Sequence, residues 1–225
     1  MQSKQQIMLT FVLLILSILF FGVSTFDIRI QDHFFDPLSH TWFLDRDLEP
    51  YHFIFYSGVK KLLILIAVGF LIALLFFRKT AWVQSYKKGI LIVILSAIFV
   101  PVAVGAFKKT TNMPCPKHEI HYGGAYPRTA VWQSYAPKYA SMKKIACWPA
   151  GHASGGFALM SLFFLFKRKR NRYLALFFAL TVGWSMGSYK MLIGDHFFSH
   201  TWITMLMAWL IILLISQTLD KKVSP

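Results

Sequence analysis

The sequence predicts an all-α, polytopic membrane protein in which six transmembrane helices form a bundle. Hydrophobic residues make up 56% of its 225 residues and charged residues only 15%, against roughly 25% charged in an average soluble domain. Apolar runs long enough to cross, or nearly cross, a hydrocarbon core of about 30 Å occur six times. They cover residues 7–24, 53–77, 89–107, 152–166, 173–189 and 200–217. We therefore expect one membrane domain over residues 1–225.

The individual runs differ in what they predict. The first has no small-x-small cleavage site after it, so it is expected to be a retained anchor rather than a removed signal peptide. The fourth and fifth are short and carry Gly and polar residues at their ends, so we expect them to line a site rather than face lipid throughout. Two long connections, 25–52 and 108–151, form the outer segments.

Basic residues between the runs predict the orientation. They occur at 78–88 and 167–172, and Lys4 and Lys221 mark the two ends. Six crossings place all of these on one side, which is then cytoplasmic. All eight His and eight of the nine acidic residues fall at or near the opposite side, although chance clustering is an alternative explanation.

The net charge indicates the kind of partner. The chain has 24 Lys and Arg against 9 Asp and Glu, a formal charge of +15. With long apolar runs and 22 Phe, this excess favours a membrane and anionic headgroups or phosphates over nucleic acid. Segment 108–151 keeps seven Lys and Arg against Glu119 alone, on the side where the orientation rule disfavours them. A phosphate-bearing substrate would explain this, and so would binding of phospholipid headgroups without chemistry.

Three clusters at the outer ends of runs three to six carry groups that suit phosphoryl transfer. They begin at Lys108, at Trp148 and at Tyr189. Cations neutralise phosphate oxygens, backbone N–H groups at a helix start can cradle them, and His can be nucleophile or general acid. The pair His196 and His200 has i, i+4 spacing, so on a helix it would share one face. Headgroup contact, helix capping, or ligation of a metal or haem are the alternatives.

The order and spacing of these clusters resemble the membrane-bound type 2 phosphatidic acid phosphatase superfamily. Its motifs are K-x6-R-P, P-S-G-H and S-R-x5-H-x3-D. This chain reads Lys108, six residues, Cys115-Pro116; then Pro149-Ala150-Gly151-His152; then Tyr189-Lys190, five residues, His196, three residues, His200. The residues that flank the motifs resemble those of a bacterial branch of the family near the lipid A phosphatases.

Five motif positions depart from the family pattern. Cys115 stands for Arg, Ala150 for Ser, Tyr189-Lys190 for the Ser-Arg pair and His200 for Asp. Lys neutralises phosphate but lacks the bidentate fork of Arg, and a neutral His stabilises a cationic intermediate less well than a carboxylate does.

The resemblance implies a role for each matched residue and no cofactor or metal. It implies that His196 is the nucleophile, that His152 is the general acid and base, and that His200 orients His196. The phosphate would be held by Lys108, Lys190 and the N–H groups of Ala150 and Gly151.

The predicted function is a phosphatase or phosphotransferase acting on a lipid phosphate or pyrophosphate, with its site facing the periplasm at a bacterial inner membrane. Lipid A, undecaprenyl pyrophosphate and phosphatidylglycerol phosphate remain possible substrates. The alternative is a weak or inactive lipid-phosphate binder or transporter on the same scaffold. Because both cysteines lie in segment 108–151, a disulfide between Cys115 and Cys147 is expected in an oxidising compartment, with two free thiols as the alternative.

Overall fold

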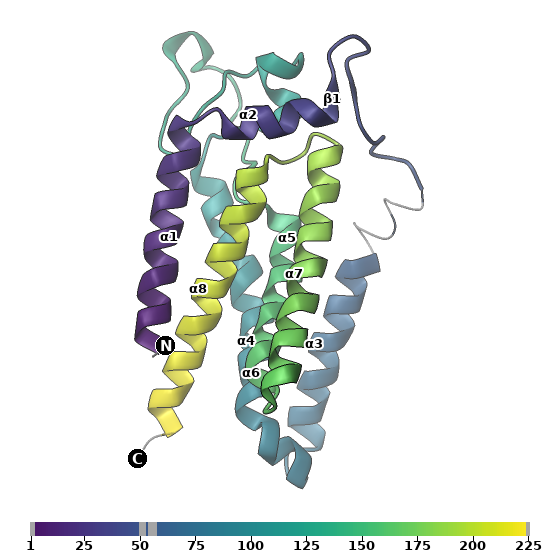
Figure 1. Ribbon diagram of the computed structural model, residues 1–225, viewed down its shortest axis with the longest axis vertical. Helices are drawn as coiled ribbons and strands as arrows, with labels where there is room; N and C mark the ends of the chain where they lie inside the picture. Colours follow the sequence, from purple (N-terminus) through teal and green to yellow (C-terminus); the bar gives the residue numbers. More distant parts are fainter. Residues whose placement is uncertain (1–2, 50–52, 54–57, 224–225) are drawn as a thin grey trace.

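Long helices run side by side along the longest axis of the molecule, and short elements cover one end of them (Figure 1). The computed structural model describes residues 3–49, 53 and 58–223. The helices are α1 Ser3–Val23, α2 Phe26–Gln31, α3 Val59–Phe76, α4 Ala81–Thr110, α5 Gly151–Ala158, α6 Leu162–Leu165, α7 Lys169–Leu192 and α8 Phe198–Val223. A two-residue antiparallel pair, β1 Phe35–Asp36 with β2 Thr41–Trp42, and short 3-10 turns complete the described structure.

The predicted all-α class is confirmed, whereas the six crossings stay a prediction. Among the described residues, three helices are long and apolar enough to cross a membrane: Lys4–Val23, Ala81–Thr110 and Phe198–Lys221. Lys61–Phe76 and Gly151–Leu165 are apolar but shorter. The predicted run 173–189 lies inside α7, and the run 152–166 forms α5 and α6 with a 3-10 turn between them. The first six residues of the run 53–77 precede α3, and 54–57 lie outside the described residues.

The two basic connections are shorter than the sequence suggested. Helix α4 begins at Ala81, so Lys87 and Lys88 lie on its second turn and not in a loop. Helix α7 begins at Lys169, so most of the basic stretch 167–172 is also helical. Lys and Arg are good helix formers, and no Pro or Gly interrupts either stretch, which explains the difference.

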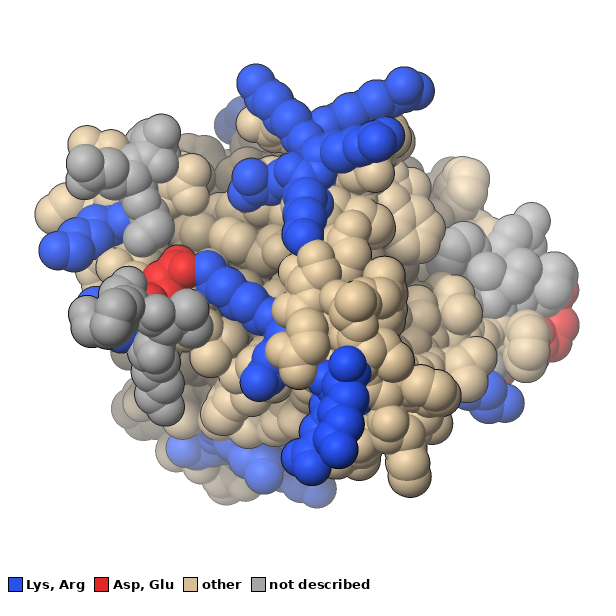
Figure 2. All heavy atoms as spheres, turned by 90° about the horizontal axis from the view of Figure 1, so that it is seen from below, with Lys and Arg blue, Asp and Glu red and all other residues tan. Residues whose placement is uncertain are grey.

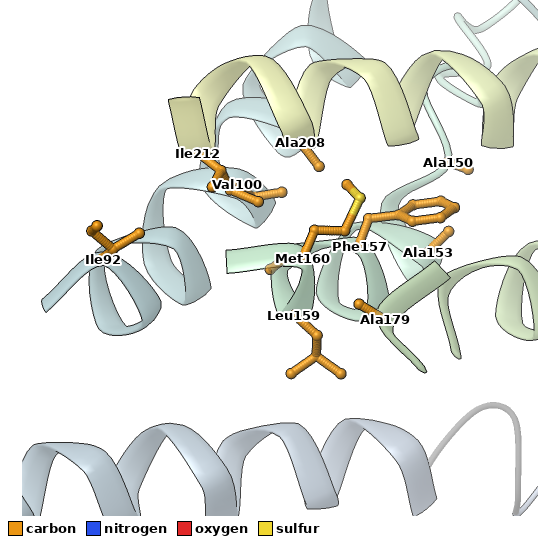
Figure 3. Packing of buried hydrophobic residues seen from close by; sticks show 11 residues of the cluster. Ile92, Val100, Ala150, Ala153, Phe157, Leu159, Met160, Ala179, Ala208 and Ile212 are labelled. Carbon is orange, nitrogen blue, oxygen red and sulfur yellow. The ribbon is translucent and has the colours of Figure 1, made fainter. Parts of the chain in front are cut away.

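Helices α4, α5, α7 and α8 share a buried apolar core that fixes the position of α5. Phe157 of α5 is fully buried among Val100 of α4, Ala179 of α7 and Ala208 of α8 (Figure 3). A Cβ atom on Gly156 would lie 2.7 Å from the Cα atom of Gly183, so α5 and α7 approach each other at backbone distance. Helix α5 is therefore held between α4, α7 and α8.

The outer segments hold the loop between α7 and α8 from several sides. The Gln31 side chain donates to the Met191 carbonyl at 2.8 Å, and the Leu44 N–H donates to the Leu192 carbonyl at 3.2 Å. Gly194 has a φ of +71°, and the Trp42 ring occupies the space where a Cβ atom would project. This loop carries His196, so its fixed shape bears directly on the site.

The opposite end of the bundle is rich in Lys and Arg (Figure 2). The two described chain ends lie toward it, as do the turn between α3 and α4 and the turn between α6 and α7 (Figure 1). Asp220 near this end pairs with Lys88. This distribution is what the cytoplasmic assignment of that end requires, and the orientation itself stays a prediction.

Candidate active site

His196 and His200 lie together at the start of α8. Their Nδ1 atoms are 3.2 Å apart, and the two residues are 3% and 0% exposed. The i, i+4 spacing thus predicted their proximity, but the expected shared helix face is wrong because α8 begins at Phe198, after His196. His196 reaches His200 from the loop instead.

The buried carboxylate of Asp27 fixes where α8 begins. Asp27 accepts hydrogen bonds from the Ser199 N–H group at 2.9 Å and from the Ser199 hydroxyl. A carboxylate on an N-terminal N–H group satisfies a donor that has no partner within the helix. Ser199 is 1% exposed, so water does not replace this acceptor. The first turn of α8, which carries His200, is therefore tied to α2.

The surroundings of His196 keep its ring neutral. Burial lowers the pKa of His196 well below its ordinary value, and the nearby His200, Lys108 and His152 lower the pKa further, while Asp195 raises it. One Nδ1 atom of the pair must donate and the other accept. When His196 is the donor, its Nε2 atom carries the lone pair that a nucleophile needs.

Helix α5 begins at Gly151, as the Pro149-Ala150-Gly151-His152 motif predicts. The Ala150 N–H group, however, donates to the His200 carbonyl at 3.2 Å and to Thr204 Oγ1 at 2.8 Å, and Ala150 is fully buried. This N–H group joins α5 to α8 and is not available to a phosphate in this structure. A Cβ atom on Gly151 would meet nothing within 4 Å, so there is open space beside the start of α5.

An elongated cavity of about 430 Å³ lies against this helix start. Its polar end is formed by Lys108, Gly151 and His152. Its other walls are mostly apolar and come from α3, α4, the stretch from α5 to α6, and α7. The structure therefore brings Lys108, Gly151 and His152 together around one space, whereas His196, His200, Lys190 and Ala150 do not line it.

A cluster of charges lies beside His196 that the sequence did not predict as a site. The Asp195 carboxylate is bound by Lys190, which was expected to hold phosphate, and also by Lys117 and Arg46. Burial alone would raise the pKa of Asp195, but hydrogen bonds from Lys117, Lys190 and Arg46 hold it well below its usual range. The sequence offered one signal for this cluster, because Asp195 directly precedes the candidate nucleophile His196.

Cys115 and Cys147 are joined in a disulfide, with Cα atoms 5.3 Å apart. The Cys147 N–H group also donates to the Met113 carbonyl at 3.2 Å. Because Cys147 lies two residues before Pro149, the bond links the end of the first motif to the approach of the second. Formation of this bond in the cell stays a prediction.

Within residues 3–49, 53 and 58–223, no three His, Cys, Asp or Glu side chains are grouped so that they could hold a metal ion. The candidate site consists of three parts in a helical membrane protein. These are the pair of His196 and His200, the cavity lined by Lys108 and His152, and the cations clustered around Asp195.

The family model described as the PAP2 superfamily matches residues 89–224, more than half of the chain. The chain belongs to this superfamily, and membership implies phosphatase activity. Comparisons with curated proteins and with solved structures gave no match. The branch near the lipid A phosphatases therefore stays a prediction.

Proposed function

We propose that this protein is a membrane phosphatase or phosphotransferase that acts on a lipid phosphate or pyrophosphate through a phosphohistidine intermediate. The observation that carries the proposal is the shape of the cavity. Along α4 it is lined by Val93, Ala97, Pro101 and finally Lys108, a stretch of roughly 22 Å at 1.5 Å per residue. An apolar space of this length that ends at a cation and a His matches an amphiphile with one phosphate end.

The walls of the cavity suit a hydrocarbon chain. Leu63, Ile64 and Ala67 of α3 face it from one side, and Leu159 faces it from the 3-10 turn after α5. Burying apolar surface contributes about 25 cal/mol per Å², so a chain in this space binds without any specific polar contact. The phosphate end would then lie at Lys108 and the open space beside Gly151.

The proposed reaction has two steps. The Nε2 atom of His196 attacks phosphorus, the bond to the lipid oxygen breaks, and His152 protonates that oxygen. His152 then takes a proton from water, which attacks phosphorus and breaks the bond to His196, releasing phosphate. Lys108 neutralises the phosphoryl oxygens, and His200 accepts the Nδ1–H of His196 and keeps its ring oriented. Because His196 is 3% exposed and does not line the cavity, the proposed attack requires a rearrangement on substrate binding.

The proposed location is the periplasmic face of a bacterial inner membrane. The support is that the basic residues of the two short connections, at 78–88 and 167–172, lie at the end of the bundle away from the outer segments, which the orientation rule assigns to the cytoplasm (Figure 2). Lipid A, undecaprenyl pyrophosphate and phosphatidylglycerol phosphate are the substrates we propose to test first.

The second candidate is a lipid-phosphate binder or transporter with weak or no activity. It is favoured by the engagement of two expected phosphate ligands elsewhere, since Lys190 binds Asp195 and the Ala150 N–H group binds α8.

Release of inorganic phosphate from a panel of lipid phosphates separates the two candidates. If the protein is a phosphatase, it should release phosphate from at least one of these lipids, and His196→Ala should abolish this release. Ala97→Phe should raise KM for a long-chain lipid phosphate by about tenfold or more while a short, soluble phosphate ester is hydrolysed as before, because Ala97 lines only the apolar part of the cavity.

Ile98→Phe is the matched control, since Ile98 is 53% exposed on the outside of α4. No release from any lipid would favour the binder. Equal effects of Ala97→Phe and Ile98→Phe would contradict the assignment of the cavity.

A further inference from the structure

Three cations from three separate segments converge on the single carboxylate of Asp195. Arg46 Nη2 lies 2.9 Å from Oδ1 and 2.8 Å from Oδ2 of Asp195. Lys117 Nζ lies 2.8 Å from Oδ1, and Lys190 Nζ lies 2.8 Å from Oδ2. Three positive charges against one carboxylate leave these four residues with a surplus of two positive charges, which Asp47, a second carboxylate that interacts with Arg46, offsets only in part.

This surplus lies in a place where water screens it only partly. The side chains of Lys190 and Asp195 are 4% and 10% exposed, and that of Lys117 is 27% exposed. Charges held partly out of water interact more strongly than charges on an open surface, and repulsion among three cations is costly there. Such a group attracts a further anion.

The partly exposed members show from which side an anion can arrive. The side chain of Arg46 is 52% exposed. Among the residues that the structure describes, its side-chain hydrogen bonds all come from Nη2, which leaves Nη1 and Nε to donate to an anion. A guanidinium group is suited to phosphate because it donates in pairs.

The cluster is also next to the candidate reaction site. Asp195 directly precedes His196 in the chain, and Lys108, which lines the cavity, interacts electrostatically with both Asp195 and Lys190. The motif position at which the family has Arg is Cys115, a disulfide partner without charge.

We propose that Arg46 and Lys117, held in place by Asp195, form an oxyanion subsite that binds a phosphate group beside His196. Arg46 thereby supplies from the outer segment the guanidinium that the chain lacks at position 115. The inference deepens the proposed function, on which it rests for the choice of phosphate as the oxyanion. Phosphate competes with Asp195 for the same cations, so Asp195 is a resident counter-ion that limits the affinity of the subsite.

A purely structural pairing makes a different prediction. Backbone contacts also hold the outer segment here, since Leu44 N–H donates to the Leu192 carbonyl and the Tyr189 hydroxyl donates to the Arg46 carbonyl at 3.1 Å. If the ion pairs served only this attachment, Arg46→Gln and Asp195→Asn would break the same contact and would change the affinity for phosphate in the same direction. In an oxyanion subsite, the two substitutions change this affinity in opposite directions.

The test is calorimetric binding of inorganic phosphate to the full chain in a neutral detergent at pH 7. We expect Arg46→Gln and Lys117→Gln to weaken binding by about tenfold or more, because each removes a charged hydrogen-bond donor. Asp195→Asn should strengthen binding by about tenfold, because it releases the cations from their internal anion. Lys144→Gln, at an exposed Lys of the same outer segment, is the matched control and should change binding by less than about twofold.

A second arm uses dioctanoyl phosphatidic acid in place of inorganic phosphate and distinguishes a lipid headgroup from the free ion as the source of the phosphate. The same opposite shifts with either ligand support the subsite. Shifts in the same direction for Arg46→Gln and Asp195→Asn, or no change for either, would overturn it. Arg46→Lys keeps the charge that pairs with Asp195 but loses the paired donors of the guanidinium, so it should weaken phosphate binding by about threefold or more, whereas a purely structural pairing would leave binding unchanged. This variant covers the case in which Asp195→Asn does not fold. Binding needs no turnover, so a protein that binds phosphate in this way but releases none from lipids would refute the proposed function alone.

Discussion

Removal of the Asp27 carboxylate should loosen the first turn of α8. Asp27→Ala leaves the Ser199 N–H and hydroxyl groups without acceptors at a residue that is 1% exposed. Each buried unsatisfied group costs about 1–3 kcal/mol, so we expect the free energy of unfolding to fall by about 2–6 kcal/mol. Asp27→Asn keeps one acceptor oxygen and should cost about half as much. Because His200 lies in the same turn, both substitutions should lower kcat more than they raise KM.

The pH dependence gives a sharper form of this prediction. Burial raises the pKa of Asp27 from 3.8 to about 6, although hydrogen bonds from Ser199 and the charge of Arg128 act in the opposite direction. The folded protein therefore binds this proton more tightly than the unfolded chain does. The contribution of Asp27 to the free energy of unfolding is therefore largest below about pH 4, falls as the pH rises to about 6, and is constant above about pH 6. A difference of roughly two pKa units corresponds to about 3 kcal/mol.

The assay is unfolding in mixed detergent micelles between pH 4.5 and 7. Glu119, whose pKa burial raises to about 8, contributes a slope of the same sign, so the difference between wild type and Asp27→Asn isolates Asp27. Asp36→Asn, which changes an exposed carboxylate of the same outer segment, is the control. Identical pH slopes for wild type and Asp27→Asn, or an Asp27→Ala protein as stable as the control, would refute the reasoning.

Three further predictions concern orientation, the disulfide and the general acid. Fusion reporters should read inside, outside, inside and inside after Lys88, Ser134, Arg170 and Pro225, and an outside signal at Arg170 would place His152 and His196 on opposite faces. Loss of the Cys115–Cys147 bond, which closes a loop of 32 residues, should lower the free energy of unfolding by about 3–4 kcal/mol, and alkylation of both thiols in unreduced, denatured protein would show that the bond is absent. His152→Ala should slow hydrolysis of lipid phosphates more than that of esters with good leaving groups, because the latter need little protonation; equal losses would argue against a general acid.

The long helices could be predicted from the sequence because their apolar runs are a local pattern, whereas α2, inside the outer segment 25–52, was not predicted. Apolar runs gave the positions of the long helices, and Pro149-Ala150-Gly151 gave the start of α5 within a residue. The expected crossing at 173–189 is less secure, because α7 carries Lys and Arg in its first turn and several Gly and Ser residues further on. Hydropathy alone does not separate a span from a helix that is buried in a bundle.

The partners within the site could not be predicted in the same way. Arg46 and Asp195 are 149 positions apart, and no spacing rule links residues at such a distance. The Ala150 N–H group looked available to phosphate, because its acceptors, Thr204 and the His200 carbonyl, come from another helix. Where α8 begins depends on Asp27 of α2, so the position of His196 outside the helix was equally hidden.

The most direct test of the central claim is to trap radiolabelled phosphate on the protein during turnover of a labelled lipid phosphate and to map the label. A phosphohistidine is stable in base and labile in acid, so the label should be lost in acid and should map to the peptide that contains His196. His196→Ala should retain its fold, take up no label and release no phosphate, whereas His200→Ala should only be slower. Label on any other residue, or near wild-type turnover by His196→Ala, would contradict the account.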